Sequence, residues 1–178
     1  MAVVTRVFEF DAAHRVMNER VKCYNLHGHR FRLEVSFGIS PKFYDLGYPI
    51  DFKELKRVFG AYIDEFLDHA CIVNPKDREV IDLCTRNKWK LWVMGHGADV
   101  DRNPSAENLA EEIFTVFREL ARLSPEEFDV RSVKLYETPN CWVQVSETQN
   151  YLDVGVKNAL FMWRDKKGTF EYDSRRCQ

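Results

Sequence analysis

The stretch "HGHRFRLEVSFGI", from His27 to Ile39, constrains the fold of this chain more than any other. Apolar or histidine side chains alternate along it with charged ones, which is the pattern of a β-strand with one buried and one exposed face. One face carries His27, His29, Phe31, Leu33, Val35 and Phe37, and the opposite face carries Arg30, Arg32 and Glu34. Such a strand belongs to a sheet whose apolar face is covered by another layer of secondary structure.

The remaining sequence supplies that sheet and that layer. Two amphipathic helices are predicted, one that follows the capping residue Asp51 and ends near "LDHACI", and one that follows the capping residue Ser105. Because the strands succeed one another as local hairpins, the sheet should be antiparallel. We therefore predict an α+β domain with a four-stranded antiparallel sheet and both helices on one face. The predicted strands cover residues 3–14, 27–39, 130–137 and 141–147.

Residues 75–103 interrupt this pattern and are predicted to form an insertion. The insertion could hold a short helix over residues 80–86 and a strand over residues 88–94. His96 lies between two glycines and is expected in a flexible loop. The domain is predicted to span residues 1–150, and a C-terminal extension without a clear period is predicted over residues 151–178.

The composition is that of a soluble globular protein and argues against several functional classes. With 178 residues, of which 45% are hydrophobic, the chain can bury a core as one domain. Its formal net charge of −2, without a basic run, gives no indication of binding to nucleic acid or to an anionic membrane. The five cysteines are irregularly spaced, and neither a signal peptide nor a membrane-spanning stretch is found, so a cytoplasmic protein without a disulfide framework is expected.

The histidines of the first stretch indicate a metal site. His27 and His29 are two residues apart on a strand, so both side chains leave the same face. His14 ends the preceding strand, and an antiparallel hairpin places that end beside the start of the next strand. Three neutral imidazoles with a fourth position left open are the ligand set of a catalytic zinc site. In the alternative reading these are unrelated histidines that share a predicted face by coincidence.

Cys23 stands four residues before His27, and its role is open at this stage. Its thiolate could close the zinc site as a fourth ligand, which would make the protein a zinc-stabilised module and not an enzyme. A thiol beside a cation could instead serve as a base or nucleophile, because the charge lowers its pKa. Most free cysteines, however, are buried thiols without a chemical role.

Two carboxylates are further candidates for a functional role. Asp68 precedes His69 at the end of the first predicted helix, and a carboxylate beside an imidazole forms a pair that can transfer protons. Glu137 ends a predicted strand and could accept two hydrogen bonds from the amino-amidine edge of a guanine-like or pterin ring. The simpler reading places all three at the surface. The remaining cysteines have no such context and are predicted to be bystanders: Cys71, Cys84, Cys141 and Cys177.

Six motifs in a fixed order carry a resemblance to a known family: "FDAAHR", "CYNLHGHRFRLEV", "IDFKELK", "LDHACI", "NPSAENLAEEIF" and "VKLYET". Together they resemble the 6-pyruvoyl-tetrahydropterin synthase family over nearly all of residues 5–145, the insertion excepted. The likeness is strongest to the bacterial 6-carboxytetrahydropterin synthase branch, which acts in queuosine and 7-deazaguanine biosynthesis. Three residues separate Cys23 from His27, whereas the pyruvoyl branch has a longer gap there.

The resemblance implies a T-fold, in which a four-stranded antiparallel sheet carries two helices on one face. Subunits of this family associate edge to edge into barrels, commonly as a hexamer of two trimers, and their active sites lie between subunits. A homo-oligomeric barrel is therefore expected for this chain.

The resemblance also implies a reaction and a set of site residues. The substrate would be 7,8-dihydroneopterin triphosphate, and the products would be 6-carboxytetrahydropterin, acetaldehyde and triphosphate. A 6-pyruvoyl-tetrahydropterin product and a non-catalytic zinc-binding T-fold protein are the alternatives. The implied roles are zinc ligation by His14, His27 and His29, proton abstraction by Cys23, proton relay by Asp68 and His69, and pterin binding by Glu137 with Ser105 and Thr138.

Overall fold

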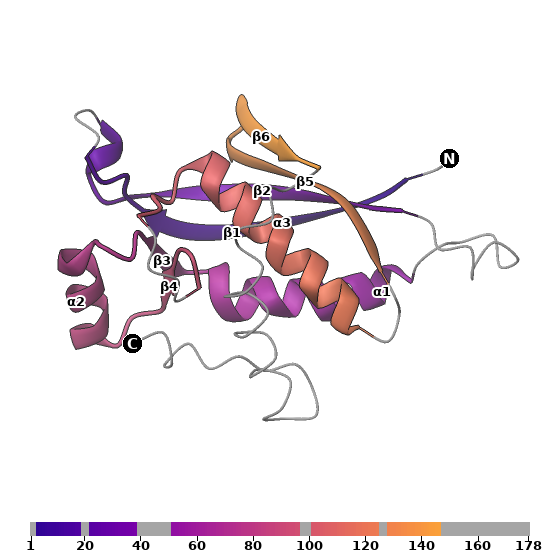
Figure 1. Ribbon diagram of the computed structural model, residues 1–178, viewed down its shortest axis with the longest axis horizontal. Helices are drawn as coiled ribbons and strands as arrows, with labels where there is room; N and C mark the ends of the chain where they lie inside the picture. Colours follow the sequence, from indigo (N-terminus) through magenta and orange to yellow (C-terminus); the bar gives the residue numbers. More distant parts are fainter. Residues whose placement is uncertain (1–2, 19–21, 39–50, 97–100, 125–127, 147–178) are drawn as a thin grey trace, which may run out of the picture.

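The computed structural model of the chain describes residues 3–18, 22–38, 51–96, 101–124 and 128–146 (Figure 1). These residues form a six-stranded sheet in the order β4-β3-β1-β2-β5-β6, with helices on both of its faces. Within these ranges, no helix combines the length and the apolar character that crossing a membrane requires. The strands are β1 (Val4–His14), β2 (His27–Gly38), β3 (Ala70–Val73), β4 (Leu91–Val93), β5 (Asp129–Thr138) and β6 (Cys141–Val145), and the α-helices are α1 (Phe52–Leu55), α2 (Arg78–Asn87) and α3 (Ala106–Leu123).

The pairing of β1 with β2 is the longest in the sheet. It runs antiparallel without a break from Val4 opposite Phe37 to His14 opposite His27. Every second residue is buried from Phe8 to His14 of β1 and from Phe31 to Phe37 of β2, as the alternation of the sequence predicts. β5 pairs antiparallel with β2, and β6 pairs antiparallel with β5. The four strands predicted from the sequence are therefore present and pair as predicted.

The prediction that the sheet is purely antiparallel and has only four strands was wrong. β3 pairs parallel with β1, and β4 pairs parallel with β3, so the sheet is mixed and extends beyond β1. β3 consists of four buried residues directly after a helix, which is too short a segment to reveal a period. β4 lies in the predicted insertion, so this part of the chain contributes a strand to the sheet.

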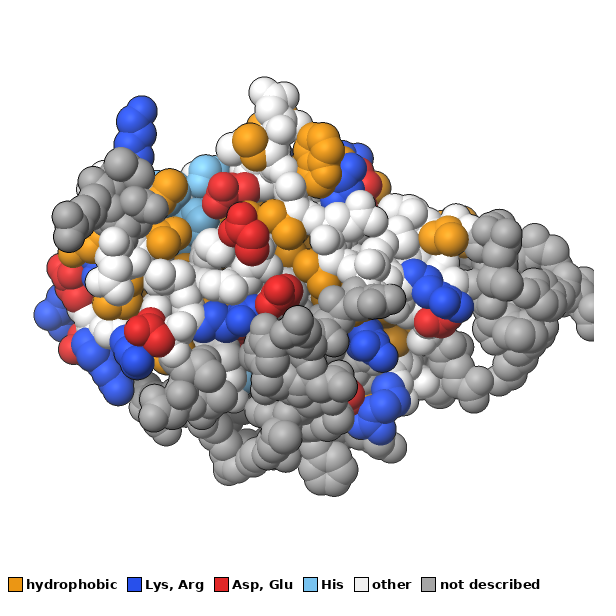
Figure 2. Space-filling model, turned by 45° about the horizontal axis from the view of Figure 1, so that its top comes forward, with side chains coloured by type: hydrophobic (Ala, Val, Ile, Leu, Met, Phe, Trp, Pro, Cys, Tyr) orange, Lys and Arg blue, Asp and Glu red, His pale blue; other side chains and the backbone are white. Residues whose placement is uncertain are grey.

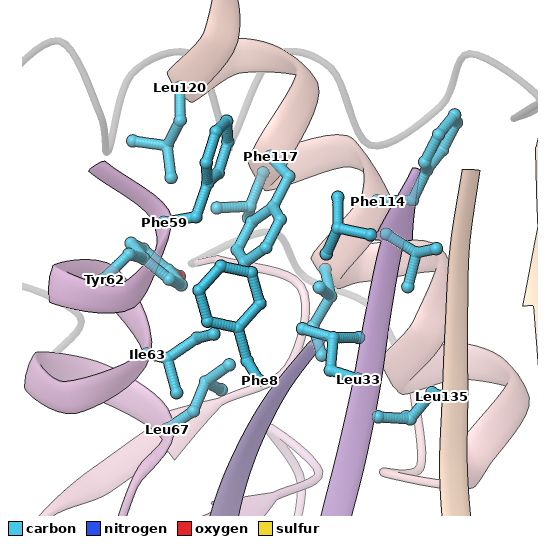
Figure 3. Packing of buried hydrophobic residues seen from close by; sticks show 14 of the residues in the cluster. Phe8, Leu33, Phe59, Tyr62, Ile63, Leu67, Phe114, Phe117, Leu120 and Leu135 are labelled. Carbon is cyan, nitrogen blue, oxygen red and sulfur yellow. The ribbon is translucent and has the colours of Figure 1, made fainter. Parts of the chain in front are cut away.

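Two helical segments cover one face of the sheet, as predicted (Figure 1). The first runs over residues 52–67 and combines α1 with two π-helical stretches, Lys56–Gly60 and Ile63–Leu67. The second is α3, whose first turn is capped by the Ser105 hydroxyl. Their apolar side chains meet those of β1 and β2 in one core (Figure 3). This core includes Phe8, Leu33, Phe59, Tyr62, Phe117 and Leu120.

A third helix, α2, packs on the opposite face of the sheet. Its residues Val80 and Cys84 are buried against Cys71 and Val73 of β3. These strand residues alternate with Ala70 and Ile72, which belong to the main core. The short helix predicted over residues 80–86 is thus confirmed, and it begins at Arg78.

His96 is buried, so the expectation of a flexible loop at this position was wrong. Its side chain is 3% exposed, and its ring packs edge-on against Trp92 with the ring centroids 5.3 Å apart. Its Nε2 lies 3.3 Å from Oε1 of Glu112, which also accepts a hydrogen bond of 2.7 Å from the Gly95 N–H. Nε of Arg102 lies 3.4 Å from Oε2 of Glu112. Glu112 lies far away in the sequence, so glycines on both sides of the histidine were a misleading local signal.

The buried carboxyl of Glu112 predicts a pH-dependent stability. Burial raises its pKa from 4.5 to about 8. The folded protein therefore keeps a proton that the unfolded chain releases, so this stabilisation is complete below about pH 4.5 and is lost as the pH rises through about 8. Between pH 6 and pH 8.5, we expect the wild type to lose about 2 kcal/mol of unfolding free energy through this group.

Urea unfolding of the wild type and of Glu112→Gln at both pH values measures this contribution. The amide cannot ionise, so the Gln variant should show a loss smaller by about that amount. Equal losses in the two proteins would mean that Glu112 does not titrate in this range.

Candidate metal centre

The paired ends of β1 and β2 bring three histidine rings together. His14 and His27 are direct cross-strand partners with ring centroids 4.6 Å apart, and the His29 centroid is 5.2 Å from that of His14 and 4.9 Å from that of His27. One ring nitrogen of each residue lies within 4.8 Å of the others, a spacing at which they could hold one metal ion. Figure 2 shows histidine side chains that reach the surface beside acidic side chains. We call these three residues the histidine cluster.

The hydrogen bonds of the cluster fix which ring nitrogens face its centre. Nδ1 of His14 lies 2.7 Å from the carbonyl oxygen of Pro104, and Nδ1 of His27 lies 2.6 Å from the carbonyl oxygen of Asn25. A carbonyl oxygen only accepts, so each Nδ1 carries the proton and donates it. In the neutral ring, Nε2 then keeps its lone pair, which is the form that binds a metal.

Burial favours the neutral form of two members of the cluster, His14 and His29. His14 is 1% exposed, and desolvation lowers its pKa, although the hydrogen bond to Pro104 and the charge of Glu137 oppose the shift. Desolvation also lowers the pKa of the half-buried His29. The buried Nε2 of His14 makes no hydrogen bond with any described residue. An unpartnered lone pair beside two further imidazoles suits zinc, which binds neutral histidine nitrogens.

Glu137 of β5 lies beside this cluster. Its Oε1 is 3.4 Å from Nε2 of His14 and 4.0 Å from Nε2 of His29, and its side chain is 29% exposed. The sequence predicted a ring-binding role for Glu137 but not this closeness to the histidines. Strand pairing explains the position, because Leu33 of β2 pairs with Leu135 and Glu137 lies two residues further on the same face.

Cys23 is exposed in a short 3₁₀ turn, Lys22–Tyr24, of the connection between β1 and β2. Its carbonyl oxygen accepts a hydrogen bond of 2.8 Å from the Val16 N–H. Among the described residues, the group of mutually close ligand atoms consists of the three histidines and contains no thiol. In this structure, Cys23 therefore does not complete a closed four-ligand site.

Asp68 and His69 form a hydrogen-bonded pair in the turn between the first helical segment and β3. Nδ1 of His69 lies 2.8 Å from Oδ2 of Asp68, and the imidazole side chain is 76% exposed. The Asp11 backbone clamps the turn from both sides, because its N–H donates to Oδ1 of Asp68 at 3.0 Å and its carbonyl accepts from the His69 N–H at 2.6 Å. This clamp holds His69 at φ 61°, which is uncommon for a residue other than glycine.

The electrostatics of this turn favour the ionised carboxylate. Burial alone would raise the pKa of Asp68. The hydrogen bonds from Asp11 and His69, together with the charges of His69 and Lys90, outweigh that effect and hold the pKa below its usual value. An ionised Asp68 orients the imidazole of His69, as a proton-transfer pair requires.

The Asp68–His69 pair and the histidine cluster lie on opposite faces of the sheet. His69 and His29 both line a cavity of about 540 Å³. The strand residues Asp11, Ala13, Gly28 and Arg30 also line it. These strand residues alternate with the ones that carry the cluster, so their side chains leave the other face. The two groups therefore leave different faces of the sheet, although His29 also contributes to the lining of the cavity beside His69.

The structure brings neither Ser105 nor Thr138 into a described contact with the histidines. The Ser105 hydroxyl accepts a hydrogen bond of 3.4 Å from the Asn108 N–H and so caps α3. Thr138 ends β5 and pairs with Cys141. A pterin contact of either residue stays a prediction. The carbonyls of Asn25 and Pro104 were missed by the sequence analysis, because a backbone carbonyl leaves no signature in residue type.

Comparison with known proteins shows which family and which relatives this chain is similar to. The sequence model of a family described as 6-pyruvoyl tetrahydropterin synthase matches residues 3–148. The chain is 40% identical over 149 residues to the 6-carboxy-5,6,7,8-tetrahydropterin synthase of Rickettsia conorii, a match that covers 82% of this chain and 100% of the relative. The Haemophilus influenzae protein of the same name is 29% identical over 154 residues, with coverage of 83% and 100%.

Solved structures share the fold. An uncharacterized protein from Wolinella succinogenes superposes with a TM-score of 0.64 at 22% identity, covering 83% of this chain and 98% of the other. The 6-pyruvoyl tetrahydropterin synthase of Caenorhabditis elegans superposes with a TM-score of 0.53 at 24% identity, with the same coverage. At these identities the likeness concerns the fold alone.

The histidine cluster predicts how metal binding responds to substitution. Replacing His27 by Ala should weaken zinc binding by more than about a hundredfold, because losing a direct ligand costs more than the 10–100-fold typical of groups that only orient one. Cys23→Ala should leave the zinc affinity within a few-fold, because the sulfur lies outside the cluster. Titration of the purified apoproteins against a chromogenic zinc chelator measures both affinities.

Cys141→Ser, which changes an exposed cysteine of β6, is a matched control for a non-specific thiol effect. A large loss of zinc affinity in Cys23→Ala alone would indicate the closed site. Unchanged affinity in His27→Ala would exclude the cluster as the zinc site.

Proposed function

The chain belongs to the 6-pyruvoyl tetrahydropterin synthase family, and from this premise we propose that it is a zinc-dependent carbon–carbon lyase. Its substrates are 7,8-dihydroneopterin triphosphate and one water molecule, and its products are 6-carboxy-5,6,7,8-tetrahydropterin, acetaldehyde and triphosphate. The product assignment rests on relatives named 6-carboxy-5,6,7,8-tetrahydropterin synthase, which match this chain along their whole length. The observation that carries the proposal is the cluster of three imidazoles beside the Glu137 carboxylate. The product would enter the biosynthesis of queuosine or another 7-deazapurine.

The proposed chemistry divides between the metal and the chain. Zinc held by His14, His27 and His29 supplies a Lewis acid for the hydroxyl oxygens of the substrate side chain. In this proposal the fourth ligand position is left to these oxygens, because the Cys23 sulfur does not belong to the cluster. Exposed Cys23 is assigned as the thiolate that removes the proton from the adjacent carbon.

Glu137 is assigned to the pterin ring, whose amino-amidine edge donates two hydrogen bonds that a carboxylate can accept together. Its partial exposure next to the cluster suits this task, because the ring and its side chain must be bound at the same time. Ser105 and Thr138 are proposed to assist from the neighbouring ends of α3 and β5.

Two basic side chains close to the histidines in sequence are poor candidates for neutralising the triphosphate. Arg15 forms a largely buried pair with Asp77, and Arg30 leaves the opposite face of the sheet, where it pairs with Asp11. The exposed Lys22, next to Cys23, is a better candidate for this contact.

Asp68 and His69 are assigned to proton relay in a site of another subunit. The pair lies across the sheet from the cluster of its own chain, which supports active sites built between chains. We therefore propose a homo-oligomer, most simply the hexamer of two trimers that the family resemblance implies.

Product analysis tests the proposed reaction. The purified zinc-loaded protein should convert 7,8-dihydroneopterin triphosphate into equimolar 6-carboxy-5,6,7,8-tetrahydropterin and acetaldehyde, the first identified by mass spectrometry and the second by coupled reduction. Cys23→Ala should retain zinc and yield neither product. A 6-pyruvoyl product without acetaldehyde would assign the chain to pyruvoyl chemistry, and intact substrate under zinc-replete conditions would contradict both reactions.

Complementation tests the sharing of one site between chains. Cys23→Ala and His69→Ala should each be inactive alone. Co-expressed, they should recover about one quarter of the wild-type activity, because a randomly mixed oligomer pairs an intact Cys23 with an intact His69 in that fraction of its sites. Two Cys23→Ala chains carrying different tags provide the co-expression control. No recovery in mixed oligomers would place both residues in the same chain's site.

A further inference from the structure

The connection between β1 and β2 carries Cys23 and is tied at its base. The Val16 N–H donates to the Cys23 carbonyl at 2.8 Å, and the Asn25 N–H donates to the Lys22 carbonyl at 3.1 Å. These bonds hold the turn together but do not fix its orientation relative to the sheet. Side chains from outside the connection must do that.

Arg15, the residue that follows His14, links this connection to the segment before α2. Its Nε lies 2.5 Å from Oδ2 of Asp77 and its Nη2 lies 2.6 Å from Oδ1, so the two side chains form a forked ion pair. The pair is largely buried, because the Arg15 side chain is 12% exposed and the Asp77 side chain is 2% exposed. The hydrogen bond to Asp77 is the main reason why the pKa of Arg15 is raised.

The same guanidinium reaches the neighbour of Cys23. Its central carbon lies 5.5 Å from the centroid of the Tyr24 ring, within the range of a cation–π contact. A continuous line of contacts therefore runs from Asp77 through Arg15 to Tyr24, adjacent to the proposed catalytic thiol. Asp77 is itself fixed, because it caps α2 by accepting a hydrogen bond of 3.2 Å from the Val80 N–H.

Asn103, which lies shortly before α3, makes a second set of contacts with the connection between β1 and β2. The Asn103 side chain accepts from the Met17 N–H and donates to the Met17 carbonyl, each at 3.0 Å. The buried Asn74 donates to Asn103 at 3.0 Å. The connection is thus held by contacts near both ends of residues 75–103, the region that the sequence set apart as an insertion.

We propose that the forked Arg15–Asp77 ion pair is a positioning pair that sets Cys23 relative to the histidine cluster. The fork requires two acceptor oxygens on Asp77, and neither residue touches substrate. A buried carboxylate without its partner would be strongly unfavourable, so the pair holds a single geometry. The catalytic consequence rests on the proposed function, whereas the effect on the order of the connection does not.

Asp77→Asn tests the pair with minimal change in shape. The amide keeps one acceptor oxygen for the cap of α2 but directs an N–H donor at the guanidinium. We expect kcat to fall roughly tenfold or more through misplacement of Cys23, with KM within about twofold of the wild type. Zinc content should be unchanged. Hydrogen exchange at the Val16 and Asn25 amides should be at least about tenfold faster.

Glu79→Gln is the matched control. Glu79 also contacts Arg15, at 2.9 Å, but its side chain is 78% exposed, so its loss should leave kcat and exchange within about twofold. Arg15→Lys, which keeps the charge but cannot form the fork, should behave like Asp77→Asn and replaces it if that variant fails to fold.

The outcomes separate this proposal from the proposed function. Unchanged amide exchange in both Asp77→Asn and Arg15→Lys overturns the positioning role, whatever the enzyme does. Faster exchange with unchanged kcat in an active protein overturns its catalytic consequence, and loss of zinc in parallel with kcat would assign the pair to the cluster instead. If the wild type itself does not turn over the substrate, the proposed function fails, and the exchange measurement still decides whether the pair orders the connection.

Discussion

The register of β1 on β2 is the constraint on which the rest of the structure depends. It places His14 directly opposite His27, and the same parity sends the large apolar side chains of both strands into the core. A slip by one residue would turn every one of these side chains to the other face. Burial of the apolar face and assembly of the three imidazole rings are therefore one event, and the hydrophobic free energy of the core also holds the imidazoles together.

Sequence alternation was sufficient for the parts of the molecule that obey a local period. The hairpin, the two helical segments on one face and the convergence of the three histidines all follow from parity, spacing and capping residues. The prediction was incomplete where the determinants are distant or have no period. β3 is too short to show a pattern, Glu112 meets His96 only in the folded chain, and Pro104 acts through its backbone carbonyl.

The two faces of the sheet have different chemical content. The face covered by α3 and the first helical segment ends in the histidine cluster, whereas the face on which α2 packs carries the charged residues of β1 and β2 and the Asp68–His69 turn. The part of the chain between α2 and α3 makes two separate contributions. The Pro104 carbonyl orients the His14 ring, and β4 extends the sheet beside β3. This segment is part of the site's framework and not an appendage to the domain.

Burial also divides the described cysteines into two chemical classes. Desolvation raises the pKa of Cys71 to about 12, and it raises the pKa of Cys84, which packs against it. At neutral pH both remain thiols, which are poor nucleophiles. Cys23 and Cys141 are exposed. Electrophilic probes, and oxidants that act on the thiolate, should therefore reach these two positions in the folded domain, while modification of the buried pair should report that α2 has separated from β3.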